Sequence, residues 1–300
     1  MSMPQTAATR EGPATRVTGF VPPIATPFQD GALDLESLRR MLDDLGDHVS
    51  GVLVGGSVGE TASLTVEERI TLMHEVERHI DRDRHFLAVS ISDNAIDYSR
   101  RLAEAAGELR ADLVMVSCPN YYTNDRAMLE EYFGSISSFV PCDICLYDNP
   151  IASHTVLSVA DIVALAVAAP RLTHIKVTDT STEKVAAVRE ATDLVVLSGD
   201  DAVLWHQLTR GAEGGMVALP MIYPDRSHRI WTAFSRGDLE SAYEEYRTVT
   251  AFIHGALGAP DYVAVIKAVL YARGVIASAE VRLPLRDLGD RRRAEVLAAL

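Results

Sequence analysis

The residue best suited to covalent chemistry is Lys176, which lies inside a short apolar segment, Leu172–Thr180. The pattern predicts a buried strand here, and lysine is almost never fully buried unless it is paired or used in chemistry. Such surroundings favour the neutral amine, which is the form that attacks a carbonyl carbon. The alternative is a lysine at the end of a strand, with its ammonium extended to water.

Two further segments carry groups that could act with this amine. Gly55-Gly-Ser-Val-Gly-Glu60 would let backbone N–H groups approach an anion, and Ser57 adds a hydroxyl, although an ordinary glycine-rich turn would look the same. Tyr147 precedes an Asp-Asn-Pro turn, where it is either a packing residue or a phenolic acid and base. Together these groups predict Schiff-base chemistry on a 2-oxo acid. The imine would form at C2, the loop would hold the carboxylate, and the tyrosine would move protons.

These groups must be positioned by elements that alternate regularly along the chain. Eight short apolar segments, each followed by a helical pattern, predict eight parallel strands joined by helices. Eight units favour an α/β fold of the (β/α)8 TIM-barrel type, and no Gly-x-Gly-x-x-Gly follows the first strand as a dinucleotide-binding sheet would require. In such a barrel the active site lies at the carboxyl ends of the strands, where the three segments should meet. The predicted strands lie within residues 17–28, 51–54, 85–92, 112–118, 143–147, 173–177, 194–197 and 215–219.

The same pattern divides the chain into three parts. Residues 1–16 are polar and are expected to form a disordered tail, residues 17–223 the barrel, and residues 224–300 an almost wholly helical extension packed on the barrel. Helices are expected to begin after Asp34 and after Thr65, where Thr-Val-Glu-Glu has the spacing of a capping box.

Composition narrows the class of protein. The chain has 300 residues and a net charge of −14, which argues against nucleic acid or an anionic membrane as a partner. Cys142 and Cys145 are spaced C-x-x-C, but no metal-spaced histidines accompany them, so with Cys118 they are interpreted as core packing. Neither a signal peptide nor an apolar stretch of about 18 residues is present, so a cytoplasmic location is expected. The sequence shows no cluster of metal-ligating residues. The imine itself accepts the electrons released at carbon during the reaction, so no cofactor is expected.

Several motifs in this order resemble the dihydrodipicolinate synthase / N-acetylneuraminate lyase superfamily of class I, pyruvate-type aldolases. The resemblance covers roughly residues 17–300. Any one of the motifs alone is a weak sign of the family, but their order and spacing together are a strong one. They are Gly-Gly-Ser-Val-Gly-Glu (55–60), Ser-Leu-Thr-x-Glu-Glu-Arg (63–69), Tyr-Asp-Asn-Pro (147–150), Ile-Lys (175–176), Ser-Gly-Asp-Asp (198–201) and Arg-Gly-Ala-Glu-Gly-Gly (210–215).

The resemblance implies a role for each of the main residues. Lys176 would form the Schiff base and Tyr147 would shuttle protons. Ser57 would bridge Tyr147 to a second tyrosine from a neighbouring subunit of a homotetramer, a dimer of dimers. Tyr122 is the better match for that tyrosine and Tyr121 the alternative. The predicted substrate-binding residues are Gly56, Val58, Thr178, Asp201 and Met216.

Two adjacent aromatic residues in a polar loop have two possible uses. Tyr121 and Tyr122 could anchor a subunit interface, which is the usual use of large exposed aromatic side chains. They could instead fold back as a lid over the mouth of their own barrel.

Three departures from the family pattern bear on the substrate. Val58 stands where relatives commonly carry a threonine that binds the pyruvoyl carboxylate, so backbone donors and Ser57 must suffice. Residues 151–154, Ile-Ala-Ser-His, lack the arginine that grips the second substrate's carboxylate in dihydrodipicolinate synthases. Ala218 replaces a polar residue of the sialic acid lyase pocket. The second substrate, an aldehyde or a sugar acid, is therefore left open.

Four functions compete for these residues. The leading one is an aldol or retro-aldol lyase that uses pyruvate or a related 2-oxo acid. The nearest alternatives keep the same Schiff base: a dehydratase of a 2-keto-3-deoxy sugar acid, or 4-hydroxy-tetrahydrodipicolinate synthase. A non-catalytic ligand-binding barrel is disfavoured because Lys176, Tyr147 and Ser57 are all present.

Overall fold

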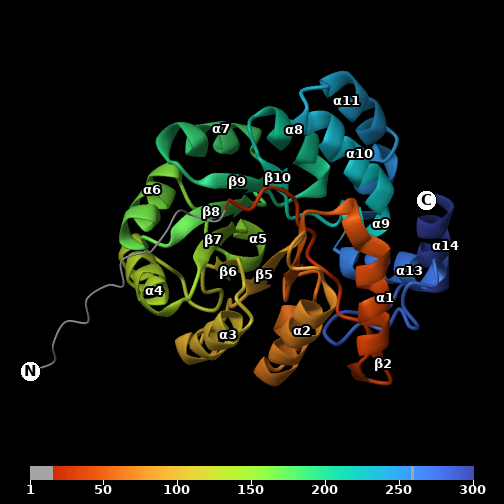
Figure 1. Ribbon diagram of the computed structural model, residues 1–300, viewed down its shortest axis with the longest axis horizontal. Coiled ribbons are helices and arrows are strands. Elements are labelled where there is room, and N and C mark those ends of the chain that lie inside the picture. The colour runs from red at the N-terminus through yellow and green to blue at the C-terminus, as the bar shows by residue number, and fades with distance from the viewer. Residues whose placement is uncertain (1–15, 258–259) are drawn as a thin grey trace, which may run out of the picture.

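The computed structural model describes residues 16–257 and 260–300, and its centre is a closed sheet of eight parallel strands (Figure 1). Hydrogen bonds join the strands in the order β1-β10-β9-β8-β7-β6-β5-β4. A parallel bridge between Pro23 and Leu53, with a 3.0 Å bond from Ile24 N to Leu53 O, joins the two ends of that order. The predicted α/β barrel is therefore confirmed. Its strands are β1 (Gly19–Phe20), β4 (Gly51–Val54), β5 (Phe86–Ser90), β6 (Leu113–Ser117), β7 (Asp143–Asp148), β8 (Leu172–Val177), β9 (Val195–Ser198) and β10 (Gly214–Gly215).

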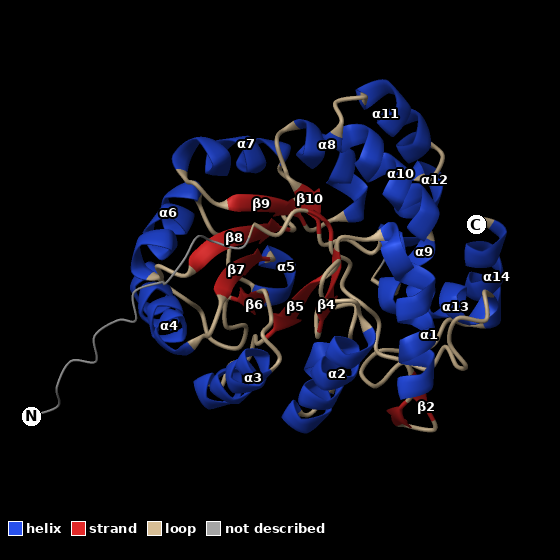
Figure 2. Cartoon of the chain, in the orientation of Figure 1, coloured by secondary structure: helices blue, strands red, loops and turns tan. Residues whose placement is uncertain are grey.

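Helices cover the outside of this ring of strands (Figure 2). Both predicted helix starts are confirmed: the Asp34 side chain accepts a hydrogen bond from Ser37 N, and Thr65 forms a capping box with Glu68. An unpredicted short helix, α5, follows β7 and lies inside the outline of the ring in Figure 2. The helices that follow the strands are α1 (Leu35–Leu45), α2 (Val66–His79), α3 (Ile96–Glu108), α4 (Arg126–Phe139), α5 (Pro150–Ser153), α6 (Val159–Ala168), α7 (Thr182–Ala191) and α8 (Leu204–Thr209).

Alternating strand residues divide the core into an inner and an outer shell. Leu113 and Met115 of β6 belong with the inner cluster, whereas Val114 and Val116 between them pack in the outer cluster. Successive strand side chains point to opposite faces, so the inner cluster fills the barrel and the outer one lies beneath the helices. Tyr147, the third inward residue of β7 after Asp143 and Cys145, therefore points into the barrel near its carboxyl end.

The chain departs from the sequence prediction at the end of the barrel. The last strand was expected within residues 215–219, but β10 is only two residues long and a helix already begins at Leu219. Gly214 explains the early pairing: its φ is +145°, and an added Cβ would lie 2.0 Å from the Gly19 carbonyl oxygen of β1. Only glycine allows β1 and β10 to approach so closely. A second unpredicted feature is the antiparallel hairpin of β2 (Phe28–Gln29) and β3 (Ala32–Leu33).

The C-terminal extension is less helical than expected, because residues 273–289 form no helix. The short helix α9 (Leu219–Ile222) precedes it. Its own α-helices are α10 (Pro224–Ser235), α11 (Leu239–Arg247), α12 (Thr250–Phe252), α13 (Tyr262–Ala272) and α14 (Asp290–Ala298), and a π-helical turn spans Ile253–Leu257. Charged groups hold the irregular segment in place. Lys267 of α13 pairs with the buried Glu60 and donates to Glu280 O at 2.7 Å, and Glu60 also accepts from Arg282 N at 2.8 Å. A buried pair with further hydrogen bonds fixes geometry because breaking it leaves a lone buried charge.

Other sequence expectations concern the N-terminal tail, the cysteines and membrane-spanning helices. The predicted disordered tail falls almost wholly on residues 1–15, which lie outside the described residues; Arg16 itself pairs with Glu213. All three cysteines are free thiols, and burial raises the pKa of Cys118, Cys142 and Cys145 to about 12, in keeping with packing. In the described part of the chain, no helix has the length and apolar character that crossing a membrane requires.

Candidate active site

Lys176 lies near the carboxyl end of β8 and is only 3% exposed. Strand register places it directly beside Tyr147 of β7, and its Nζ stands 4.1 Å from the centroid of the Tyr147 ring. Among residues 16–257 and 260–300, no carboxylate lies within ion-pairing distance of this amine, whereas the buried Lys184 and Lys267 both have such partners. Its contact with the aromatic ring has a cation–π geometry for the charged form.

Gly199, which follows β9, provides the space that the lysine side chain occupies. A Cβ at this position would lie 2.2 Å from Thr178 Oγ1 and 2.9 and 3.0 Å from Cγ and Cε of Lys176. Carbon atoms that are not bonded prefer roughly 3.5–4.0 Å. Sequence reasoning noted the Ser-Gly-Asp-Asp motif but did not find this role, because it depends on a contact between two neighbouring strands.

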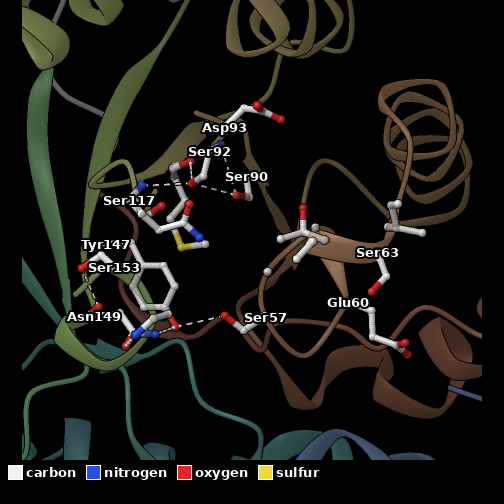
Figure 3. A pocket seen from close by; sticks show the side chains of 18 of the residues that line it. Ser57, Glu60, Ser63, Ser90, Ser92, Asp93, Ser117, Tyr147, Asn149 and Ser153 are labelled. Carbon is white, nitrogen blue, oxygen red and sulfur yellow. Dashed lines mark hydrogen bonds between the residues drawn. The ribbon is translucent and has the colours of Figure 1, made fainter. Parts of the chain in front are cut away.

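Two side chains hold the hydroxyl of Tyr147. Ser57 Oγ lies 3.4 Å from it, and Asn149 Nδ2 donates to it at 2.9 Å (Figure 3). Burial acts to raise the pKa of this phenol, but the Lys176 charge and hydrogen bonds from Ser57 and Asn149, with a further one from Thr178, outweigh it. The pKa of Tyr147 is consequently lowered. A phenol with a lowered pKa beside an amine is suited to moving protons.

Asn149 is a site residue that sequence reasoning missed. Its amide nitrogen holds the Tyr147 hydroxyl, while its Oδ1 accepts from Ala152 N at 3.1 Å and caps α5. Pro150 at the first helical position and the Asn cap before it were a readable helix signal. The link to Tyr147 was not readable, since it requires the side chain to turn back along the strand.

The loop after β4 presents free backbone donors. Gly55 adopts φ +75°, and the hydrogen bonds of the loop use the N–H groups of Glu60 and Thr61. Within the described residues, those of Ser57 and Val58 have no protein acceptor. The Val58 side chain is buried in the outer core, so this residue can offer a ligand only its backbone. Two free N–H groups in one loop can bind a carboxylate.

A cavity of about 380 Å³ opens beside Tyr147 and Ser57. Figure 3 shows Ser57 pointing toward Tyr147 on one side of the cavity, with Ser90, Ser92 and Ser117 gathered on another. Gly56 also lines it, in keeping with its predicted place at the site. Lys176 is not among the lining residues, but its Nζ lies 4.1 Å from the ring centroid of Tyr147, which is one of them.

The remaining predicted binding residues do not line this cavity. Thr178 interacts with Tyr147 and donates to Gly199 O at 3.4 Å. Asp201 accepts from the backbone N–H groups of Ala218 and Leu219 at 2.9 and 2.7 Å, so both its oxygens have partners. Burial raises the pKa of Asp201 to about 6 despite these bonds. None of Thr178, Asp201, Val58 and the fully buried Met216 lines the cavity, so the structure does not bring them together with Ser57 there.

The two loop tyrosines are exposed. Tyr121 and Tyr122 are 80% and 68% exposed, and their rings pack edge-to-face with centroids 5.2 Å apart. Neither lines the cavity, although Pro119 and Asn120 of the same loop do, so the choice between the interface and the lid stays a prediction. Their exposure agrees with the interface alternative.

The fold and the site define a class of (β/α)8-barrel protein. It has a buried amine against a phenol, with free backbone donors at the carboxyl ends of its strands, which are the groups that Schiff-base chemistry needs. Among the residues that the structure describes, no group of three His, Cys, Asp or Glu side chains is placed to hold a metal ion. Residues 16–300 match the profile of the Dihydrodipicolinate synthetase family, so the chain belongs to this family and is a lyase of it.

Individual relatives agree with this assignment. The 4-hydroxy-tetrahydrodipicolinate synthase of Methanosphaerula palustris is 30% identical over 289 residues, which are 94% of this chain and 96% of the relative. An uncharacterized DapA-like lyase of Halobacterium salinarum is 30% identical over 94% of this chain and 92% of the relative. Among solved structures, the complex of YagE from E. coli K12 with pyruvate has a TM-score of 0.88 at 27% identity, covering 94% of this chain and 96% of that one. The dihydrodipicolinate synthase of Thermotoga maritima, at 23% identity and a TM-score of 0.89, covers 95% of this chain and 98% of its own and shares the fold.

Proposed function

We propose that the protein is a class I lyase that binds pyruvate or a related 2-oxo acid as a Schiff base on Lys176. The amine would attack C2, the carbinolamine would lose water, and loss of a C3 proton from the imine would give the enamine. The observation that carries this proposal is the Lys176–Tyr147 pair: a buried amine with its Nζ 4.1 Å from the ring centroid of a phenol whose pKa is lowered. The pyruvate complex of YagE, a family member, supports the choice of a 2-oxo acid.

The site also offers a group for each of the remaining steps of this reaction. Tyr147 would give a proton to the departing carbinolamine hydroxyl and take or return one when carbon bonds break or form. The free N–H groups of Ser57 and Val58 would bind the carboxylate of the 2-oxo acid. Because Val58 offers no hydroxyl, this contact is expected to be weaker by about one hydrogen bond than in relatives with threonine, roughly 0.5–1.5 kcal/mol.

The cavity lining favours a second substrate portion that carries hydroxyls. Its polar groups are mostly serine hydroxyls and side-chain amides. Among the described residues, Arg69 is the one cation that lines it, and both Nη atoms of this guanidinium have protein partners while its Nε is buried. It donates to Ser90 O at 3.0 Å and Ser92 O at 3.2 Å, and pairs with Asp93 at 3.4 Å.

No free cation is therefore offered to a second carboxylate. This supports an aldolase or a dehydratase acting on a 2-keto-3-deoxy sugar acid over a 4-hydroxy-tetrahydrodipicolinate synthase, whose second substrate carries a carboxylate.

Borohydride reduction in the presence of pyruvate tests the proposal. The expected result is a covalent mass increase on the peptide that contains Lys176, lost in Lys176→Arg. Lys184 is an internal control, because it is also buried but pairs with Asp148 at 2.6 Å and should stay unmodified. Absence of the adduct on Lys176 would overturn the proposed function.

A panel of 2-keto-3-deoxy sugar acids then separates the two chemistries. Release of pyruvate and an aldehyde identifies the retro-aldol lyase, and a dehydrated oxo acid without pyruvate identifies the dehydratase. A homotetrameric assembly and a cytoplasmic location remain predictions from the sequence. Analytical ultracentrifugation of the purified protein tests the first.

A further inference from the structure

Glu60 ends the loop that offers the free backbone donors, and its backbone is strained. Its φ is +56°, in the left-handed region that residues with a side chain rarely adopt. Among the described residues, four that are not glycine have a positive φ, and Glu60 is the one of these that is buried. Such a conformation persists only where the surrounding structure holds it.

The conformation of Glu60 decides how the loop closes. Its N–H donates to Ser57 O at 3.1 Å, and its carbonyl accepts from Ser63 N at 2.8 Å. In the described chain, the turn that these bonds form leaves the N–H groups of Ser57 and Val58 without a protein acceptor. A change at Glu60 would therefore move the two donors proposed to bind the carboxylate of the 2-oxo acid.

The Glu60 carboxylate is held by the C-terminal extension. One oxygen forms an ion pair with Lys267 of α13, and the other accepts from Arg282 N at 2.8 Å. The side chains of Glu60 and Lys267 are both 0% exposed. Figure 3 shows the carboxylate directed away from Tyr147 and Ser57, so it acts on the loop and not on a substrate beside them.

Lys267 and Arg282 are themselves fixed by further contacts. Lys267 Nζ donates to Glu280 O at 2.7 Å and lies 4.2 Å from the centroid of the Phe28 ring. Arg282 Cζ lies 4.2 Å from the same centroid, and its guanidinium pairs with Glu68 in the first turn of α2. The carboxylate between them has a fixed place, because separating a buried ion pair leaves an uncompensated charge.

We propose that Glu60 and Lys267 are positioning residues that set the affinity of this loop for the carboxylate of the 2-oxo acid. The inference rests on the proposed function, in which the N–H groups of Ser57 and Val58 bind that carboxylate. Lys176 lies on β8 and is not part of the pair, so the imine step should be little affected once the substrate is bound. The C-terminal extension thus controls substrate binding through Lys267, which does not itself line the cavity.

Exchange of the pyruvate C3 protons in D2O, followed by NMR over a range of pyruvate concentrations, separates binding from chemistry. It gives a KM and a kcat and needs no second substrate. Glu60→Gln has nearly the same shape but no charge to pair with Lys267. Its KM is expected to rise by about tenfold or more, which corresponds to the loss of one hydrogen bond to a charged group, while kcat stays within about threefold.

A double variant separates positioning from folding. Glu60→Gln leaves Lys267 buried without a counter-ion, so its melting temperature should fall. Lys267→Met added to Glu60→Gln removes both charges and nearly keeps the volume, so the melting temperature should return toward that of the parent. Because methionine cannot hold residue 60 in its strained conformation, the KM of the double variant should stay raised. A parental KM in either variant would overturn the proposal.

Arg273→Met is the matched control. Arg273 is the C-cap residue of α13, pairs with Asp44 at 2.8 Å and does not line the cavity, so KM and kcat should be parental. A KM raised equally in this variant would mean that any loosening of the helix suffices, which would overturn the assignment to Glu60. Absence of the borohydride adduct on Lys176 in the parent would instead overturn the proposed function itself, so the two failures are distinguishable.

Discussion

Gly199→Ala should disable the site without touching any group that does chemistry. The new methyl group would lie 2.9 and 3.0 Å from Cγ and Cε of Lys176 and 2.2 Å from Thr178 Oγ1. The backbone cannot easily yield, because Gly199 N donates to Val177 O at 2.8 Å as part of the strand pairing. The lysine side chain and the threonine hydroxyl must therefore move.

The size of the effect follows from these distances. Restoring an ordinary carbon–carbon contact of about 3.5 Å requires the lysine stem to shift by about 0.5 Å. A misplacement of about 1 Å costs roughly 10²-fold in rate, so about tenfold or more is expected here. Overpacking should also lower the free energy of unfolding by about 1–3 kcal/mol.

The assays are the rate of borohydride trapping with pyruvate and the exchange of the pyruvate C3 protons in D2O, followed by NMR, which reports enamine formation. Both should fall by about tenfold or more in Gly199→Ala, at a temperature well below its melting point. Gly289→Ala is the matched control, because a Cβ there meets nothing within 4 Å. Trapping at the parent rate in Gly199→Ala would refute the view that this glycine positions the lysine.

Three further predictions concern the neighbours of the amine. Tyr147→Phe should slow C3 exchange by roughly 10²–10⁴-fold and still allow trapping; an unchanged rate would make Tyr147 a packing residue. Asn149→Asp keeps the cap of α5 but loses the donor to the Tyr147 hydroxyl. C3 exchange should therefore fall by up to about tenfold with little change in melting temperature. Asn149→Ala loses the cap as well, so its free energy of unfolding should also fall by about 1 kcal/mol. Burial raises the pKa of Asp201 from 3.8 to about 6. Between pH 3.8 and pH 6, the folded state therefore keeps a proton on Asp201 that the unfolded state has released. Relative to Asp201→Ala, the unfolding free energy of the parent should therefore fall by about 3 kcal/mol as pH rises through this window, and denaturant titrations that show no such slope would contradict the assignment.

Much of the barrel could be predicted because its signals are local. Thr65 and Glu68 form a capping box three residues apart, and the apolar strands and helical patterns alternate over short stretches. Lys176 and Tyr147 were found for the same reason: each is an unusual residue at the end of an apolar run, and parallel strands bring such ends together.

The errors of prediction lie where the neighbours in space decide the structure. The last strand was placed too far along because its pairing depends on Gly214 approaching Gly19 of the first strand. The irregular segment 273–289 was read as helical, yet its place is set by Lys267 and the buried Glu60, which no local pattern reveals.

The sequence by itself determined the fold class, the amine and the phenol, because residue type and strand periodicity are properties of short segments. Only the tertiary structure decided what surrounds them. Gly199 makes room for the lysine, and Asn149 holds the phenol. Tyr262, the first residue of α13, lines the same cavity from the C-terminal extension. The physical reason is that space and hydrogen-bond partners at the mouth of a closed barrel come from several strands and helices at once, and their separation along the chain hides these contacts from any local pattern.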